Sequence, residues 1–196
     1  MNKLLLATLI SLLALGCQQT GDTAASDDAG ATKSDSKQKA AAIAHIKPAK
    51  AAATQPSWGQ PTGTVAFYKV GDKVKVVADL TGLPPGKHGF HIHEKGDMSS
   101  PDLMSTGGHF NPTGHAHGGP TTSPVHAGDF GNINADANGA AHLELTVSDL
   151  SIGTGEKNDI IGKPVIVHAK PDDLSTQPSG NAGARIAGGL IEAGKK

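Results

Sequence analysis

The chain has 196 residues, of which 26 are glycine and 12 are proline, together about one fifth. This length and composition favour a single loop-rich β domain with appendages over several domains or a helical bundle. Seventeen basic and eighteen acidic residues leave a formal charge of −1, and there are only six aromatic residues (four Phe, one Trp and one Tyr). We therefore expect no nucleic-acid partner and no general electrostatic attraction to an anionic membrane.

Residues 1–17 have the layout of an export signal. Lys3 precedes an apolar run of roughly a dozen residues, which is too short to prefer spanning a bilayer. The run ends in Leu-Ala-Leu-Gly-Cys, which resembles a bacterial lipobox, so we expect a lipid on Cys17 as the only membrane attachment. A simple cleaved signal and an uncleaved anchor are the alternatives. We expect the protein to be exported to the periplasm or cell envelope and to be lipid-anchored there.

Residues 18–57 are rich in Ala, Ser, Thr, Asp, Lys and Gln and lack sustained apolar periodicity. Such a segment buries too little apolar surface to offset its ordering entropy, which predicts a disordered tether. His45 lies within this segment and is expected to be solvated. The folded domain is predicted to occupy residues 58–196, beginning at Trp58.

Six short β-rich runs follow, separated by stretches rich in Gly, Pro, Asn and Asp. Val-Gly-Asp joins the first two runs as a hairpin, and Leu-Pro-Pro-Gly makes a turn before the third. This punctuation predicts an all-β, antiparallel sandwich or barrel. The loops at about 94–125 and 169–184 are longer than a connection needs, which is typical of functional or disordered loops. The predicted strands are 64–68, 73–80, 88–93, 141–147, 165–169 and 185–191.

The ten histidines are the most informative residues. Because Cys17 is the only cysteine, a disulfide within the chain is excluded, and any metal site must use imidazole and carboxylate ligands. His91 and His93 stand at i and i+2 of a predicted strand, which places both rings on one face and Phe90 and Ile92 on the other. Among the Gly and Pro turns that follow come more candidate ligands: His109, His115, His117, His126, Asp129 and His168. This grouping predicts a metal centre.

Five motifs occur in order between about residues 60 and 192: GKHGFHIHEKGD, GGHFNP, HGGP…HAGDFGN, VHAKPDDL and GNAGAR. In sequence and approximate spacing they resemble the signatures of the bacterial, exported copper/zinc superoxide dismutases. The resemblance implies an eight-stranded antiparallel Greek-key β-barrel or sandwich with two long functional loops. It also implies dismutation of superoxide to dioxygen and hydrogen peroxide, by alternate reduction and reoxidation of a histidine-bound copper.

The resemblance further implies the ligands of two metal ions. His91, His93, His109 and His168 would hold copper, and His109, His117, His126 and Asp129 would hold zinc. Four nitrogen donors suit Cu(II), and a closed set of three histidines and one aspartate suits Zn(II). His109 would bridge the ions, leave copper on its reduction, and then carry a proton to peroxide.

Other positions receive roles from the same resemblance. Arg185, the only arginine, would guide the anionic substrate to copper. Asp172 would join His91 to His117 by hydrogen bonds and so orient both rings, with Asp173 as the competing acid.

Three further histidines lie near these motifs or between them. His88 is expected to be a hydrogen-bonded structural residue. His115 lies two positions from His117, and we prefer His117 as the ligand because it directly precedes Gly-Gly-Pro. His142 falls in a predicted strand away from the motifs and is expected to be a bystander.

The chain departs from the family at one feature. Members ordinarily tie the loop after His93 to the last strand by a disulfide, and the aligned positions here are Met98 and Gly188. Metal binding, packing of Met98 or dimerisation must then order loop 94–108, and a homodimer is compatible with the sequence. We expect the metal-free form to be unusually labile, because losing such a crosslink typically costs about 2–5 kcal/mol. The alternative function is an exported copper/zinc carrier or store on the same fold.

Overall fold

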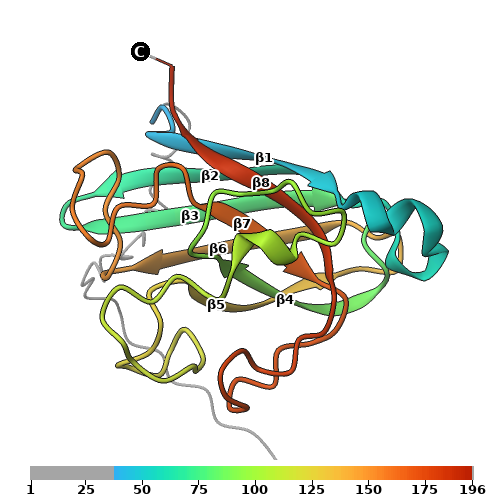
Figure 1. Cartoon of the computed structure of the whole chain (residues 1–196). Helices are drawn as coiled ribbons and strands as arrows, with labels where there is room; N and C mark the ends of the chain where they lie inside the picture. Colours follow the sequence, from blue (N-terminus) through green and yellow to red (C-terminus); the bar gives the residue numbers. More distant parts are fainter. Residues whose placement is uncertain (1–37, 196) are drawn as a thin grey trace, which may run out of the picture. The chain divides into compact units, whose positions relative to one another are not determined.

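The computed structural model describes residues 38–195, in which eight antiparallel strands close into a β-barrel (Figure 1). Around the barrel the order is β1, β2, β3, β6, β5, β4, β7, β8. Since β3 and β4 are consecutive in the chain but not adjacent in the barrel, the connections are of the Greek-key type. The strands are β1 (Ala42–Pro48), β2 (Thr62–Val70), β3 (Lys73–Thr81), β4 (Gly86–Ile92), β5 (Asp129–Ala135), β6 (Ala141–Val147), β7 (Pro164–His168) and β8 (Arg185–Ala193).

The predicted all-β, eight-stranded antiparallel fold is therefore confirmed. The six strands predicted from the sequence correspond to β2, β3, β4, β6, β7 and β8. Three short 3₁₀ helices also occur: η1 (Lys50–Thr54), η2 (Pro56–Trp58) and η3 (Met104–Thr106). Within residues 38–195, no helix is long and apolar enough to cross a membrane.

Alternating side chains fill the barrel interior. On β3, Val74 and Val76 are buried, whereas Lys75 and Val77, which alternate with them, are only partly buried. From β4 and β5, Phe90 and Phe130 meet in the core with their ring centroids 5.8 Å apart. At the tight β2–β3 turn, Gly71 has a φ of 60°, a left-handed conformation that glycine adopts without steric cost. The apolar faces of the strands thus hold the barrel together.

The prediction of a disordered tether is wrong for residues 42–57. Strand β1 pairs with both β2 and β8, and η1 and η2 follow it. Ala42, Ala44 and Ile46 point into the core, while His45 on the same strand is exposed as expected. These small alanines give a weak hydrophobic signal, but between two neighbouring strands even small side chains complete the barrel. The predicted export signal, Cys17 and the first part of the tether lie outside the described residues.

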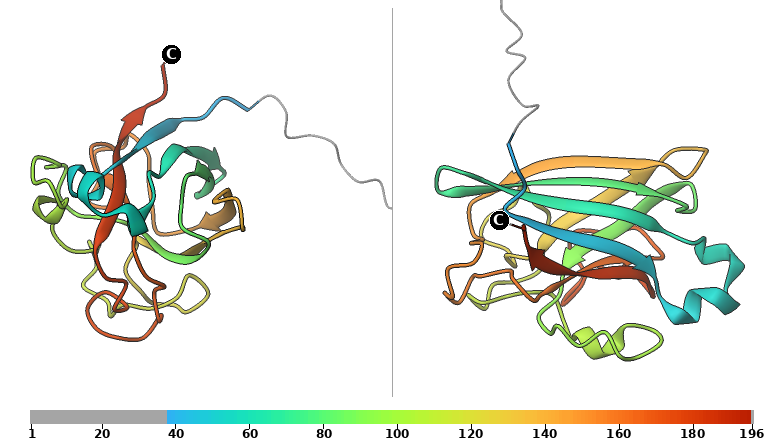
Figure 2. Two further views of the ribbon diagram at one scale, coloured as in Figure 1. Left: turned by 90° about the vertical axis from the view of Figure 1, so that its right-hand side faces the viewer. Right: turned by 90° about the horizontal axis from the view of Figure 1, so that it is seen from above.

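Two long loops, at residues 94–128 and 169–184, lie side by side on one side of the barrel (Figure 1, Figure 2). They are joined directly, because the backbone N–H of His117 donates to the Oε1 atom of Gln177 at 2.8 Å and the Gln177 amide donates to the His117 carbonyl at 2.9 Å. The two loops therefore meet at His117 and Gln177.

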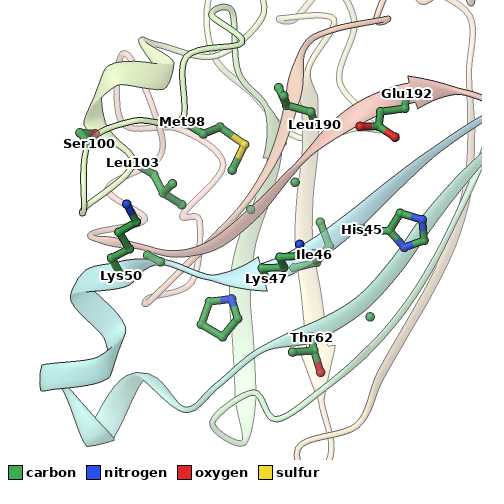
Figure 3. A pocket seen from close by; sticks show the side chains of 15 residues that line it. His45, Ile46, Lys47, Lys50, Thr62, Met98, Ser100, Leu103, Leu190 and Glu192 are labelled. Atoms are coloured by element: carbon green, nitrogen blue, oxygen red, sulfur yellow. The ribbon is translucent and has the colours of Figure 1, made fainter.

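The part of the loop nearest β8 is held by apolar packing. Met98 packs against a small cluster made by Ala49, Leu103 and Ile166. A Cβ atom built on Gly188 would lie 3.2 Å from the Met98 Cε atom, so the two positions aligned with the missing disulfide do meet in space. Met98 and Leu103 extend from the loop into a groove of about 770 Å³ above β1 and β8 (Figure 3). None of the predicted metal ligands lines this groove.

Candidate metal centre

The barrel and its loops bring the predicted ligands together. Strand β4 supplies His91, with His93 directly after it; β5 begins at Asp129, and β7 ends at His168. Phe90 and Ile92 of β4 are buried in the core, as the alternation predicts. Loop 94–128 supplies the remaining members, which are His109, His117 and His126.

Two groups of four side chains have the spacing of metal sites. In each group, one ligand atom from every member lies within 4.8 Å of the others, and every member is buried. The first group, called here the copper group, is His91, His93, His109 and His168. The second, called here the zinc group, is His109, His117, His126 and Asp129. His109 belongs to both, so its two ring nitrogens can face two different ions.

Hydrogen bonds fix which ring nitrogens of the copper group carry lone pairs. Nδ1 of His93 lies 3.0 Å from the Gly107 carbonyl oxygen, and Nδ1 of His168 lies 3.1 Å from that of Gly183. A carbonyl oxygen only accepts, so in the neutral rings both Nδ1 atoms carry the proton. The two Nε2 atoms are then lone-pair donors, and they face each other at 3.3 Å. Such an arrangement fits a shared cation better than it fits a hydrogen bond.

Two unpartnered nitrogens complete this group. Nδ1 of His91 and Nε2 of His109 are buried and have no hydrogen-bond partner within residues 38–195. A buried polar atom without a partner is costly unless something else, such as a metal ion, satisfies it. With the Nε2 atoms of His93 and His168, they give four nitrogen donors, which is a set that suits Cu(II).

The zinc group is organised around Asp129. Its Oδ1 atom accepts from Nδ1 of His109 at 2.7 Å and from Nδ1 of His126 at 3.2 Å. Nδ1 of His117 lies 3.0 Å from Oδ2 of Asp129 yet makes no hydrogen bond there. Burial raises the pKa of Asp129, but hydrogen bonds from His109, His126 and the Gly118 N–H outweigh it and hold that pKa well below its ordinary value. A carboxylate anion among three imidazoles suits Zn(II).

Asp172 connects the copper group to the zinc group through one histidine of each. Its Oδ2 atom accepts from Nε2 of His91 at 2.8 Å, and its Oδ1 atom accepts from Nε2 of His117 at 3.0 Å. Because each Nε2 atom donates, the Nδ1 atom of each ring is left with a lone pair for a metal ion. Asp173 instead accepts from backbone and hydroxyl groups of Ser175 and Thr176 in an exposed turn, and these bonds lower its pKa to about 2.

Residues 61–191 match the family model of copper/zinc superoxide dismutase. The chain belongs to this family. A solved structure titled as that of the clock protein EA4 is similar, with 37% sequence identity and a TM-score of 0.67. The match covers 80% of this chain and 96% of the EA4 chain.

The neutral state of the copper group follows from its burial in this superoxide dismutase fold. Burial, followed by the neighbouring histidines, lowers the pKa of His91 and of His93 well below the ordinary value of 6.5. Burial likewise lowers the pKa of His168 to about 4. For His109, burial lowers the pKa although the bond to Asp129 opposes it. Neutral imidazoles are the form that binds metal ions.

Arg185 lies beside the copper group. It pairs with His168 across strands β7 and β8, and its charge helps to lower the pKa of His93 and His168. Its Nη1 atom donates to the Leu103 carbonyl at 2.7 Å, and its Nη2 atom donates to the Gly107 carbonyl at 2.7 Å. The guanidinium is half-buried, and burial lowers its pKa from the ordinary value of 12.5. A fixed cation thus lies next to the copper group.

The other histidines occupy different places. His88 is buried outside both groups, with its ring nitrogens 2.8 Å from the carbonyl oxygens of His168 and Pro84. His115 is exposed and contacts Thr113 and Val125. His142 is also exposed and pairs with Asp79 on the barrel surface. The structure brings none of these three into a metal group.

Several residues that position the ligands were not predicted from the sequence. Gln177 binds the backbone of His117, and the Asn132 side chain exchanges two hydrogen bonds with the backbone of Asp172, at 2.8 and 2.9 Å. The carbonyl groups of Gly107 and Gly183 orient copper-group rings. A carbonyl leaves no residue-specific signal, and Gln177 lies 60 positions from its partner, so no local pattern could have found these contacts.

Proposed function

We propose that this protein is an enzyme that converts two superoxide ions and two protons to dioxygen and hydrogen peroxide. The observation that carries the proposal is the place of His109 in both donor groups, next to a fixed guanidinium. When bound, copper would supply one-electron chemistry, and zinc would supply a redox-inert positive charge.

His109 is central to the proposed function because it is the residue shared by the copper group and the zinc group. Its Nδ1 atom is held by Asp129 at 2.7 Å, which keeps the ring in place, whereas Nε2 is buried and has no partner in the described part of the chain. Nε2 is therefore the atom at which the ring can bind copper or hold a proton for the product. His109, His117, His126 and Asp129 would hold zinc, which would replace the proton that Nδ1 of His109 shares with Asp129, and the Asp129 carboxylate would supply the negative charge.

Arg185 would draw the substrate inward. The guanidinium keeps its positive charge at neutral pH, and three hydrogen bonds hold it beside the copper group. A cation fixed in this way raises the encounter rate with a small anion, and salt screens the effect. A carrier or store of copper and zinc would have no use for such a group, so Arg185 supports the enzyme over the alternative.

The test is to load the protein with copper and zinc, measure both metals, and follow superoxide decay by stopped-flow absorption. We expect fast decay that slows as ionic strength rises. Arg185→Ala should lose most of that salt dependence and roughly tenfold or more in kcat/KM, because steering adds about 10- to 1,000-fold. Lys50→Ala, which removes an exposed cation on η1, is the matched control and should behave as the wild type. Full copper occupancy without superoxide consumption would instead select the carrier.

We also propose that the protein is exported and anchored by a lipid on Cys17. The apolar run that precedes this cysteine supports the proposal. Mass spectrometry of the mature protein should find the lipid on an N-terminal Cys17, and Cys17→Ser should release the protein from the membrane fraction. A mature N-terminus elsewhere would contradict the proposal.

A further inference from the structure

Thr106 is a buried polar residue that belongs to neither metal group and has no role in the function proposed above. Its side chain lies between the guanidinium of Arg185 and the ring of His93, and the residue is fully buried. Its backbone is held independently of the hydroxyl, since its N–H donates to the Leu103 carbonyl at 3.2 Å and its carbonyl accepts from the Lys95 N–H at 3.0 Å. The hydroxyl can therefore be removed without releasing the loop.

The direction of each hydrogen bond at the hydroxyl can be deduced. The hydroxyl has one proton, which it donates to the Leu103 carbonyl at 2.8 Å. The oxygen is then left to accept, and it accepts from Nη1 of Arg185 at 2.8 Å. Nδ1 of His93 lies 3.3 Å away and carries a proton directed mainly at the Gly107 carbonyl. A single oxygen thus touches both the anion-guiding cation and a copper-group histidine.

We propose that the Thr106 hydroxyl is a positioning group that fixes the Arg185 guanidinium relative to the copper group. This inference rests on the proposed function, and it adds a residue to the machinery of that function. Without the hydroxyl, Nη1 of Arg185 would keep the Leu103 carbonyl but lose the one side-chain acceptor that the described residues give it. The guanidinium would then be held only by the carbonyl groups of Leu103 and Gly107, so its charge would be held less tightly in one position beside the anion's path.

Two substitutions separate the hydroxyl from the shape of the side chain. Thr106→Val keeps the shape and removes the hydroxyl, whereas Thr106→Ser keeps the hydroxyl. Thr146→Val, at an exposed position of β6, is a control for the loss of a threonine hydroxyl elsewhere. Copper and zinc content and melting temperature are measured for all variants, so that loss of fold or metal is recognised.

The first readout is the affinity of the copper-loaded protein for azide, a small monovalent anion, followed by the change in Cu(II) absorption. We expect Thr106→Val to bind azide roughly three- to tenfold more weakly, since a hydrogen bond to a charged group is lost while others remain. Thr106→Ser and Thr146→Val should stay within about twofold of the wild type. Wild-type azide affinity in a fully copper-loaded Thr106→Val protein would overturn the proposal.

The second readout needs neither metal nor activity. Arg185 is the only arginine in the chain, so the ¹⁵N signals of its guanidinium need no assignment. In the metal-free protein, we expect separate, slowly exchanging Nη signals for the wild type and Thr106→Ser, and measurably faster exchange between these signals for Thr106→Val, which keeps only the two carbonyl acceptors. Identical spectra for wild type and Thr106→Val would refute the positioning role. A wild type that consumes no superoxide would overturn the proposed function, and the ¹⁵N comparison would still decide the part that Thr106 plays.

Discussion

Acid should unfold the metal-free protein at a pH at which most folded proteins are stable. The histidines of the copper group have pKa values below 6.5 in the folded state, because burial disfavours their charged form. The unfolded chain therefore binds more protons than the folded one between pH 6.5 and the folded pKa values, so stability is full above about pH 7 and falls as pH falls.

The size of this effect can be worked out from His168. Its pKa of about 4 lies roughly 2.5 units below the ordinary value, which at 1.36 kcal/mol per unit gives a loss of roughly 3 kcal/mol between pH 7 and pH 4. The pKa values of the other three histidines of the copper group are also lowered, so they make the loss of stability with falling pH steeper. Asp129 acts in a separate window, because its lowered pKa gives stability that is lost only below about pH 4. The loss from His168 alone is a substantial part of the total stability of about 5–15 kcal/mol that is typical of a folded domain.

The assay is urea unfolding of EDTA-treated protein at several pH values between 7.5 and 4.5, followed by circular dichroism. We expect the free energy of unfolding to fall by more than about 1.4 kcal/mol per pH unit at the steepest point, which corresponds to the uptake of more than one proton on unfolding. His168→Gln should make the slope shallower, whereas His45→Gln, an exposed histidine, is the control. If fewer than one proton is taken up on unfolding at the steepest point, or if His168→Gln leaves the pH dependence of the unfolding free energy unchanged, the account of buried neutral rings is refuted.

Three further predictions concern the loops and the metals. Met98→Ala should lower the free energy of unfolding of the metal-free protein by about 1–2 kcal/mol, because the loop loses its contact over Gly188; unchanged urea unfolding would contradict this role. Asp172→Asn should weaken metal binding about 10- to 100-fold in competition with a chelator, since two rings lose their shared acceptor, and wild-type affinities would show that this acceptor is dispensable. His115→Ala should keep its zinc and His117→Ala should lose it by elemental analysis; the reverse result would show that the wrong histidine was chosen.

Strand positions were predictable where the chain alternates large apolar and polar residues, as on β2 and β3. Strand β1 was missed because its buried positions include Ala42 and Ala44, whose small side chains resemble those of a linker. Strand β5 was missed for a different reason. It contains Gly131, with a φ of 72°, and two asparagines, so its composition is typical of a loop.

For the site, residue type and spacing carried most of the information. Imidazole and carboxylate side chains are chemically distinctive, so His91, His93 and Asp129 stand out among the glycine and proline turns and apolar residues around them. Their orientation is not encoded in the same way, because backbone carbonyls such as that of Gly107 set which ring nitrogen donates. Thr106 carries no signal of its own, since its contacts to Arg185 arise only when β8 meets the loop.

The most direct test of the whole account is anomalous diffraction from crystals of the metal-loaded protein, measured at the copper and zinc absorption edges. We expect one copper peak at bonding distance from Nε2 of His109 and one zinc peak about 2.0–2.1 Å from Nδ1 of the same ring. A single metal peak, or two peaks of which neither contacts His109, would contradict the shared-histidine centre.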